Sequence, residues 1–180
     1  LTKQTFTSYE ESNKAQAEME ATQKFSSVVL TADNSFDIDY AATAESYMAI
    51  ANEYPETASG NMCYFLAASN YLYAGDLANA KAALAKLQNV EGDLGAHINA
   101  MALTLAGDIA VEENDYQTAA AKFEKALAAS KNVDIYGDNT LKLGLVYEAM
   151  GDEAKAQAIY KKASEKYDNT KVDFAKYIKE

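Results

Sequence analysis

The sequence predicts an all-α fold of stacked helical hairpins, mainly because one two-residue step occurs three times. The steps are Gly75-Asp76, Asn114-Asp115 and Gly151-Asp152. Gly or Asn can end a helix in the left-handed conformation, and Asp can cap the next helix by accepting from its free N–H groups. An alanine stands four residues after each aspartate. These alanines recur at intervals of 39 and 37 residues, within the range of stacked helical repeats.

The second helix of each hairpin is expected directly after the step. Its pattern is the alanine, a large apolar residue four positions later and another apolar residue three positions after that, which makes one buried stripe. The stripes are Ala80, Leu84 and Leu87; Ala119, Phe123 and Ala126; and Ala156, Tyr160 and Ala163. A weaker stripe of Thr43, Tyr47 and Ile50 follows Asp39, and Pro55 ends its helix. We expect second helices at about 40–54, 77–89, 116–130 and 153–167.

The first helix of each hairpin is expected just before the step, at Asn61–Ala74, Leu94–Glu113 and Thr140–Met150. Each carries apolar residues at i, i+3, i+4 and i+7 spacing. Small residues recur at one phase of these helices, namely Ala68, Gly107 and Gly144. Because Gly inside a helix costs about 1 kcal/mol relative to Ala, the two glycines predict a close approach of the partner helix.

The ends of the chain complete the predicted domain. Residues 6–30 predict one long helix, 31–38 a polar insertion, and 172–179 a short closing helix that covers the last hairpin with Phe174 and Ile178. Repeat arrays need such caps because an open end exposes a repeat interface. We expect a single domain over 1–180, divided into 1–38, a degenerate repeat at 39–57, three hairpins at 58–170 and a cap at 171–180.

Composition excludes several classes of function. The 180 residues carry a net charge of −11, and all 16 basic residues are lysines. This acidic field repels nucleic acid, so no nucleic-acid partner is expected. No run of 18 apolar residues occurs that would span a bilayer, and the single cysteine allows no internal disulfide. The chain begins with Leu1 rather than Met, which suggests a piece of a longer protein, and membrane attachment would need a segment upstream.

Candidate catalytic and metal-binding residues are few. His97 is the only histidine and Cys63 the only cysteine, so a structural role is expected for both. The acidic loop from Asp33 to Asp39 resembles a calcium loop, but Ile38 stands where an EF-hand needs Gly and Ala44 where it needs Glu. We interpret the paired carboxylates as helix caps or as residues of solvent-exposed helix faces. We expect no catalytic residue, no cofactor and no metal.

The hairpins resemble the tetratricopeptide repeat family closely over about residues 39–170. The residues that carry the resemblance are Tyr64, Ala67, Ala68, Tyr71, Gly75-Asp76, Ala80, Leu84 and Leu87, then Leu103, Ala106-Gly107, Asp115-Tyr116, Ala119, Phe123 and Ala126, then Leu143-Gly144, Tyr147, Gly151-Asp152, Ala156, Tyr160 and Ala163. Extra residues near 89–95 and 130–137 depart from the 34-residue period. The resemblance implies a right-handed α-α superhelix that binds proteins rather than an enzyme.

A narrower resemblance concerns membrane-anchored repeat proteins of the bacterial envelope. The long N-terminal helix, the weak hairpin ending in Tyr54-Pro55-Glu56-Thr57 and three better repeats are similar to the ancillary SecYEG translocon subunit family. This resemblance implies a docking or chaperone-like scaffold in the periplasm or anchored to a membrane of the envelope. The residues themselves leave a cytoplasmic location open.

In the repeat family the first helices line a concave groove, and this position carries over residue by residue. The lining would be Met62, Phe65, Ser69 and Leu72, then Met101, Thr104, Asp108 and Val111, then Asp138, Leu141, Leu145 and Glu148. The Lys/Asn pairs that hold a peptide carboxylate in some members are missing at these positions. A protein or peptide partner is therefore expected in an apolar groove. The alternative is that neighbouring helices or the N-terminal helix bury these side chains.

Two other classes of function stay open at this point. One is an enzyme acting on polysaccharide or peptidoglycan and built on an α-superhelix, which a carboxylate facing a deep polar pocket would favour. The other is a self-assembling structural module or homo-oligomer, which a large self-complementary hydrophobic face would favour.

Overall fold

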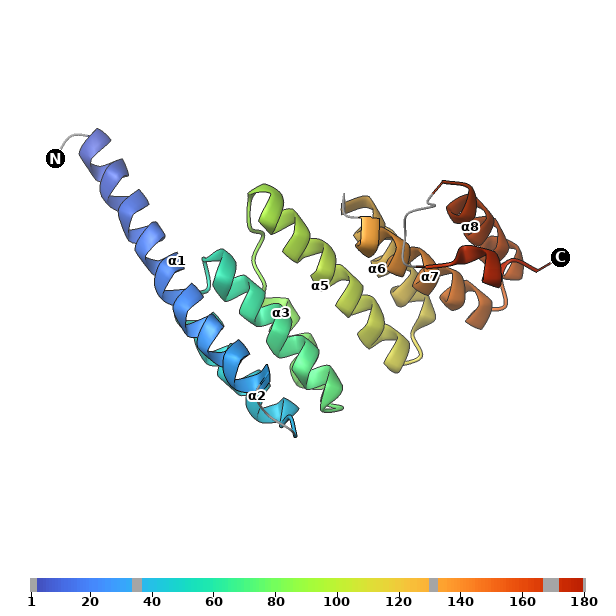
Figure 1. Ribbon diagram of the computed structural model, residues 1–180, viewed down its shortest axis with the longest axis horizontal. Coiled ribbons are helices and arrows are strands. Elements are labelled where there is room, and N and C mark those ends of the chain that lie inside the picture. Colours follow the sequence, from blue (N-terminus) through green and yellow to red (C-terminus); the bar gives the residue numbers. More distant parts are fainter. Residues whose placement is uncertain (1–2, 34–36, 130–132, 167–171, 180) are drawn as a thin grey trace. The chain divides into compact units, whose positions relative to one another are not determined.

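The computed structural model describes residues 3–33, 37–129, 133–166 and 172–179, and all regular structure in these ranges is helical (Figure 1). The elements are α1 (Lys3–Asp33), α2 (Tyr40–Glu53), α3 (Ala58–Tyr73), α4 (Leu77–Lys86), α5 (Gly92–Glu112), α6 (Tyr116–Ala129), α7 (Val133–Ala149), α8 (Glu153–Lys166) and a 3₁₀ turn, η1 (Phe174–Tyr177). The chain divides into two compact units, residues 1–94 and 95–180. Each unit is described by itself, and the single-domain organisation stays a prediction.

The predicted steps are the turns between paired helices. Gly75, Asn114 and Gly151 have φ of +78°, +59° and +79°, the left-handed conformation that ends a helix. At the first turn the Asp76 N–H donates to the Tyr71 carbonyl at 2.8 Å and the Gly75 N–H to the Leu72 carbonyl at 2.9 Å. The other two turns repeat both bonds at the same offsets. These paired bonds satisfy carbonyls that the end of each helix leaves unpaired.

The aspartate of each step also begins the next helix. Asp76 Oδ1 accepts from the Asn79 N–H at 3.0 Å, Asp115 Oδ1 from Thr118 at 3.1 Å and Asp152 Oδ1 from Lys155 at 3.2 Å. Asp39 caps α2 in the same way through the Ala42 N–H, so the helix predicted after Asp39 begins where expected.

The two predicted helix glycines lie where paired helices touch. A Cβ added at Gly107 would stand 2.4 Å from the Phe123 ring, and one at Gly144 would stand 2.1 Å from the Tyr160 ring. Both rings are fully buried. The close approach predicted from the repeat phase is therefore confirmed, and it explains why Gly rather than the larger Ala stands at positions 107 and 144.

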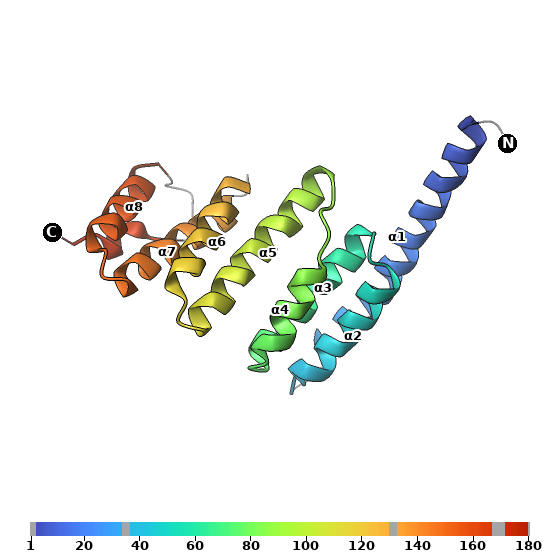
Figure 2. The same cartoon turned by 180° about the vertical axis from the view of Figure 1, so that it is seen from behind.

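Unit 1 contains α1 to α4 (Figure 2). Only the C-terminal half of α1 packs on the unit. Ala21 is fully buried there, and the Phe25 ring lies 6.2 Å from the Tyr47 ring of α2. Every side chain from Lys3 to Gln16 is exposed. The first half of α1 therefore extends beyond the packed part of its unit.

The core of unit 2 is built from side chains of α5, α6, α7, α8 and η1. One cluster joins Ala110 of α5, Phe123 of α6 and Val146 of α7, and a second joins Ala156 and Tyr160 of α8 to Phe174 of η1. Phe174 thus closes the last hairpin as predicted. The closing element is a 3₁₀ turn, however, and Ile178 is 36% exposed, so the cap role predicted for Ile178 is wrong. Tyr177 takes this role by packing on the Tyr160 ring at 5.5 Å.

Other helix boundaries also differ from the prediction: α1 and α3, for example, begin three residues earlier than expected, at Lys3 and Ala58. α4 ends at Lys86 because Leu87 becomes extended and the Gln88 N–H donates to the buried Asn61 side chain at 2.6 Å. α7 begins at Val133, seven residues earlier than expected, with Gly137 and Asn139 buried inside it. α1 continues to Asp33, so the first residues of the expected insertion are helical.

One described helix, α5, is long and apolar enough by length and composition alone to cross a bilayer. In this structure Ile98, Leu105 and Ile109 of α5 are buried. A core helix of a hairpin can meet the same criterion, and 39% of the apolar window of α5 is buried in this structure.

Candidate partner-binding surface

The predicted lining positions of unit 1 lie on one stripe of α3. Met62, Phe65, Ser69 and Leu72 are all half-buried, so none of them is fully covered. α3 contains no charged residue. α1 bonds to the first turn of α3, where Glu18 accepts from the Ala58 N–H at 2.7 Å and from the Ser59 N–H at 2.8 Å.

In unit 2 two of the lining positions are used for pairing between first helices. Thr104 of α5 bonds to the side chain of Asn139 of α7, with the amide nitrogen 2.8 Å from the hydroxyl. Asn139 is fully buried and also donates to the Ile135 carbonyl at 2.9 Å. A buried amide needs such partners, because an unpaired polar group costs free energy. This bond fixes α5 beside α7.

Asp108, the next lining position on α5, forms an ion pair with Lys142 of α7. The Lys142 ammonium lies 2.8 Å from Asp108 and 3.2 Å from Asp138, and it is 5.9 Å from the centre of the Phe123 ring. The Asp108 and Lys142 side chains are each 30% exposed, whereas the Asp138 side chain is 54% exposed. Lys142 therefore links the two first helices of the unit through carboxylates on both.

The protonation of this group follows from burial and neighbouring charge. Burial raises the pKa of Asp108; Lys142 opposes this shift, while the charges of Asp138 and Glu112 add to it. For Lys142, burial lowers the pKa, but its bond to Asp108 and the charges of Asp108 and Asp138 together outweigh burial and raise it. The raised pKa of Lys142 favours its charged form. The raised pKa of Asp108, in contrast, disfavours the charged form of that half-buried carboxylate.

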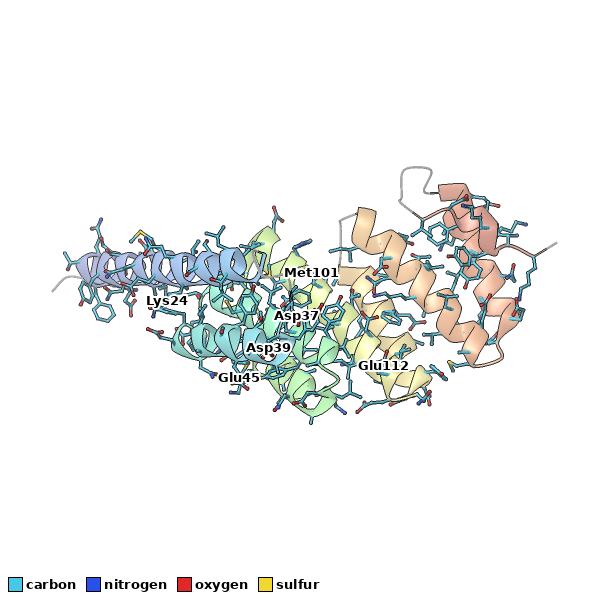
Figure 3. The ribbon with its side chains drawn as sticks, turned by 60° about the horizontal axis from the view of Figure 1, so that its bottom comes forward. Lys24, Asp37, Asp39, Glu45, Met101 and Glu112 are labelled. Carbon is cyan, nitrogen blue, oxygen red and sulfur yellow. The ribbon has the colours of Figure 1, made fainter. Side chains whose placement is uncertain are left out.

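The remaining lining positions of unit 2 differ in exposure. Leu141 packs on the cluster around Tyr160, and Val111 packs on the cluster around Phe123. Met101 and Glu148 are half-buried, and Leu145 is 43% exposed. We call this side of α5 and α7 the first-helix face, defined by Asp108, Glu112, Asp138, Lys142, Leu145 and Glu148. In Figure 3, Met101 and Glu112 are labelled on α5.

Sequence reasoning missed Asn139 and Lys142. Each lies next to a predicted lining position, and each bonds to a residue one repeat earlier, 35 positions before for Thr104 and 34 for Asp108. A spacing of one repeat between two polar residues was the sequence signal that could have indicated these pairs. The side chains of Asn139 and Lys142 are both already bonded to partners within the chain.

The other candidate residues have structural surroundings. Cys63 is fully buried, and burial raises the pKa of its thiol to about 12. His97 is half-buried near the start of α5. Asp39 of the acidic loop caps α2, while 34–36 of that loop lie outside the described residues. Among the residues that the structure describes, no three His, Cys, Asp or Glu side chains are placed to hold a metal ion.

Comparison with known proteins identifies the repeat. Residues 110–175 match the tetratricopeptide repeat family model. Among solved structures, the crystal structure of MamA is similar in fold, with a TM-score of 0.56 and 24% identity over 71% of this chain and 68% of that one. A search of curated proteins found no matching relative. The same turns, caps and glycine contacts recur before and within the matched residues. Residues 110–175 thus form tetratricopeptide repeats, and the likeness to MamA shows a shared helical repeat fold over 71% of the chain.

Proposed function

We propose that this chain is a non-enzymatic scaffold that binds a protein or peptide segment on the exposed side of its first helices. The observation that carries the proposal is the incomplete burial of large apolar side chains at lining positions. Phe65 and Met101 are half-buried and Leu145 is 43% exposed, although each belongs to a helix that is otherwise packed in a core. Aromatic and Met side chains in such positions are typical anchors for a partner.

The chemistry of the reactive groups supports binding over catalysis. A nucleophilic thiol needs a lowered pKa and access to substrate, and Cys63 has neither. Asp108 has a raised pKa, as a general acid would, but its carboxylate is bonded to Lys142 at 2.8 Å. A carboxylate held by an ammonium is poorly placed to donate a proton to a substrate.

We further propose a docking or chaperone-like role in the bacterial envelope, attached to a membrane through a segment outside this sequence. The support is the resemblance of the long first helix and the Tyr54-Pro55-Glu56-Thr57 turn to envelope repeat proteins. In the structure this turn joins α2 to α3: Thr57 caps α3 by accepting from the Gly60 N–H at 2.9 Å. Fractionation of source cells should recover the full-length protein with envelope membranes; recovery in the soluble cytoplasmic fraction would contradict this location.

Partner capture tests the scaffold. The immobilised chain should retain partners from a lysate of source cells, and Phe65→Ala with Met101→Ser should lose them, because removing one buried anchor commonly costs about 2 kcal/mol, roughly thirtyfold in affinity. Circular dichroism should show that this variant stays folded. The matched control is Tyr73→Ala with Met150→Ser, which changes exposed residues of the same kind outside the lining positions. Equal capture by both variants would refute binding at the lining positions.

A further inference from the structure

Charge in unit 2 is divided between its first and second helices. The charged residues of the first-helix face are Asp108, Glu112, Asp138 and Glu148 against Lys142 alone. The described charged side chains of α6 and α8 are mainly basic: Lys122, Lys125, Lys155, Lys161 and Lys162 against Glu124, Glu153 and Glu165. The first-helix face is therefore acidic even within an acidic chain, and the second helices have the opposite sign.

Lys142 does not neutralise the carboxylates around it. Asp108 and Asp138 both lie within ion-pair distance of its ammonium, and Glu112 acts on Asp108 from one helical turn further along α5. Two carboxylates thus contact one cation, and a third acts on Asp108. Asp138 is more than half exposed and Glu112 is exposed, so both can accept a further cationic group at little desolvation cost.

An apolar contact lies beside this acidic group. Leu145 is one turn beyond Lys142 on α7 and is 43% exposed, in a unit where most other described large aliphatic side chains are buried or half-buried. The face therefore offers carboxylates and an aliphatic side chain within a few turns of the same helix. A binding segment that combines cationic and aliphatic side chains would complement both features.

Resting on the proposed scaffold function, we propose that the first-helix face of unit 2 binds a polypeptide segment in which lysine or arginine alternates with aliphatic residues. Asp138 and Glu112 bind the cationic groups, and Leu145 packs against the aliphatic ones. Charge complementarity decides between this occupant and a second copy of the chain. The chain carries −11 overall, so two copies repel each other, whereas a basic segment is attracted from a distance.

Synthetic peptides of equal length test the proposal with the whole chain. The first alternates lysine with leucine, the second replaces lysine with glutamate, and the third replaces leucine with serine. Fluorescence anisotropy should show binding of the Lys/Leu peptide that weakens as salt is added, and affinities at least about tenfold lower for the other two. Equal or tighter binding of the glutamate peptide would overturn the proposal.

Paired variants locate the binding. Glu112→Gln with Asp138→Asn should lower the affinity for the Lys/Leu peptide by about fivefold, as expected for two exposed charges, and adding Leu145→Ser should lower it further. The matched control, Glu165→Gln with Asp173→Asn, removes two carboxylates from α8 and the residue before η1 and should leave binding unchanged. An equal loss in both pairs would mean that only net charge matters and would overturn the assignment of the face.

The remaining outcomes distinguish a failure of the basic-segment proposal from a failure of the proposed scaffold function. If capture of lysate partners still depends on Phe65 and Met101 while the Lys/Leu peptide does not bind, the partner class is wrong and the scaffold function stands. If neither capture nor peptide binding occurs, both fail. A dimer seen by light scattering that Glu112→Gln with Asp138→Asn abolishes would overturn the basic segment in favour of a second copy.

Discussion

The hairpins of unit 2 and the junction of α1 with α2 and α3 in unit 1 are held by different kinds of contact. In unit 2, the Phe123 and Tyr160 rings fill the space left by Gly107 and Gly144. At the α1 junction, polar contacts stand beside the apolar ones of Ala21 and Phe25: Glu18 caps α3, Thr22 bonds to Ser59, and Lys24 pairs with Glu53. Ring-into-glycine packing tolerates no change of volume, whereas exposed polar contacts can be lost one at a time. The four predictions below test this difference.

The largest effect is expected at the ring-into-glycine contact of α7 and α8. Gly144→Ala places a methyl group 2.1 Å from the Tyr160 ring, so the ring or a helix must move. Overpacking of this kind costs about 1–3 kcal/mol, and the gain in helix propensity of roughly 1 kcal/mol offsets only part of a cost at the upper end. We expect a net loss of about 2 kcal/mol from urea unfolding. The same substitution in a Tyr160→Val background should cost much less, and equal costs would contradict the contact.

The second prediction concerns the ion pair between α5 and α7. Lys142→Met leaves the half-buried Asp108 without its cation and beside Asp138 and Glu112. We expect a loss of about 1–2 kcal/mol near neutral pH, less than for a fully buried pair because both side chains retain 30% exposure.

The pH dependence of that loss has a definite sign. Asp108 already has a raised pKa in the folded state, and the variant should raise it further. A folded state that binds a proton more tightly than the unfolded chain gains stability as pH falls through the raised pKa. The penalty of Lys142→Met should therefore shrink between about pH 7 and pH 4. A penalty that is constant or grows toward acid would contradict the pairing.

The third prediction tests the polar junction of unit 1. Glu18→Gln weakens acceptance from the Ala58 and Ser59 N–H groups, which begin α3 and have no partner within their helix. We expect a cost of about 1 kcal/mol, typical of a lost helix cap. Lys24→Met, which removes the exposed ion pair with Glu53, is the control and should leave the urea midpoint unchanged. A larger effect for Lys24→Met than for Glu18→Gln would reverse this ranking.

The smallest expected effect is a gain. The Tyr160 hydroxyl is buried without a hydrogen-bond partner in the described structure, and burial raises its pKa to about 12. Tyr160→Phe keeps the ring against Gly144 and removes the unsatisfied group. Since such a group costs about 1 kcal/mol or more, we expect stability to rise by roughly 0.5–1 kcal/mol. A loss of stability on thermal unfolding would show that the hydroxyl has a partner.

Local features of the fold were predictable from the sequence, and tertiary ones less so. A step such as Gly75-Asp76 contains its own left-handed residue and cap, so its hydrogen bonds need no distant partner. The start of α7 was missed because Gly137 and Asn139 are weak helix formers. Their burial, and the Asn139 bond to Thr104, override that preference. The early end of α4 likewise depends on a distant residue, because the Gln88 N–H donates to the buried Asn61 side chain instead of continuing the helix.

The candidate surface shows the same limit. The repeat phase indicated that Asp108 and Leu145 belong to first helices, and both lie on the first-helix face. It could not show that Asp108 is already paired, because Lys142 comes from a different helix and occupies a position that the phase does not single out. Which lining side chains contact a partner stays a prediction.

The turn aspartates have a consequence for how the chain folds. Asp76 joins two helices through bonds that span only a few residues. Its N–H donates to the Tyr71 carbonyl, and its carboxylate accepts from the Asn79 N–H. Each hairpin can therefore close through contacts of low contact order before any distant part of the chain is in place. Chains dominated by such contacts fold quickly, and in repeat arrays folding can begin at any hairpin and spread to its neighbours. The folding rate should accordingly depend on the most stable hairpin more than on the number of hairpins.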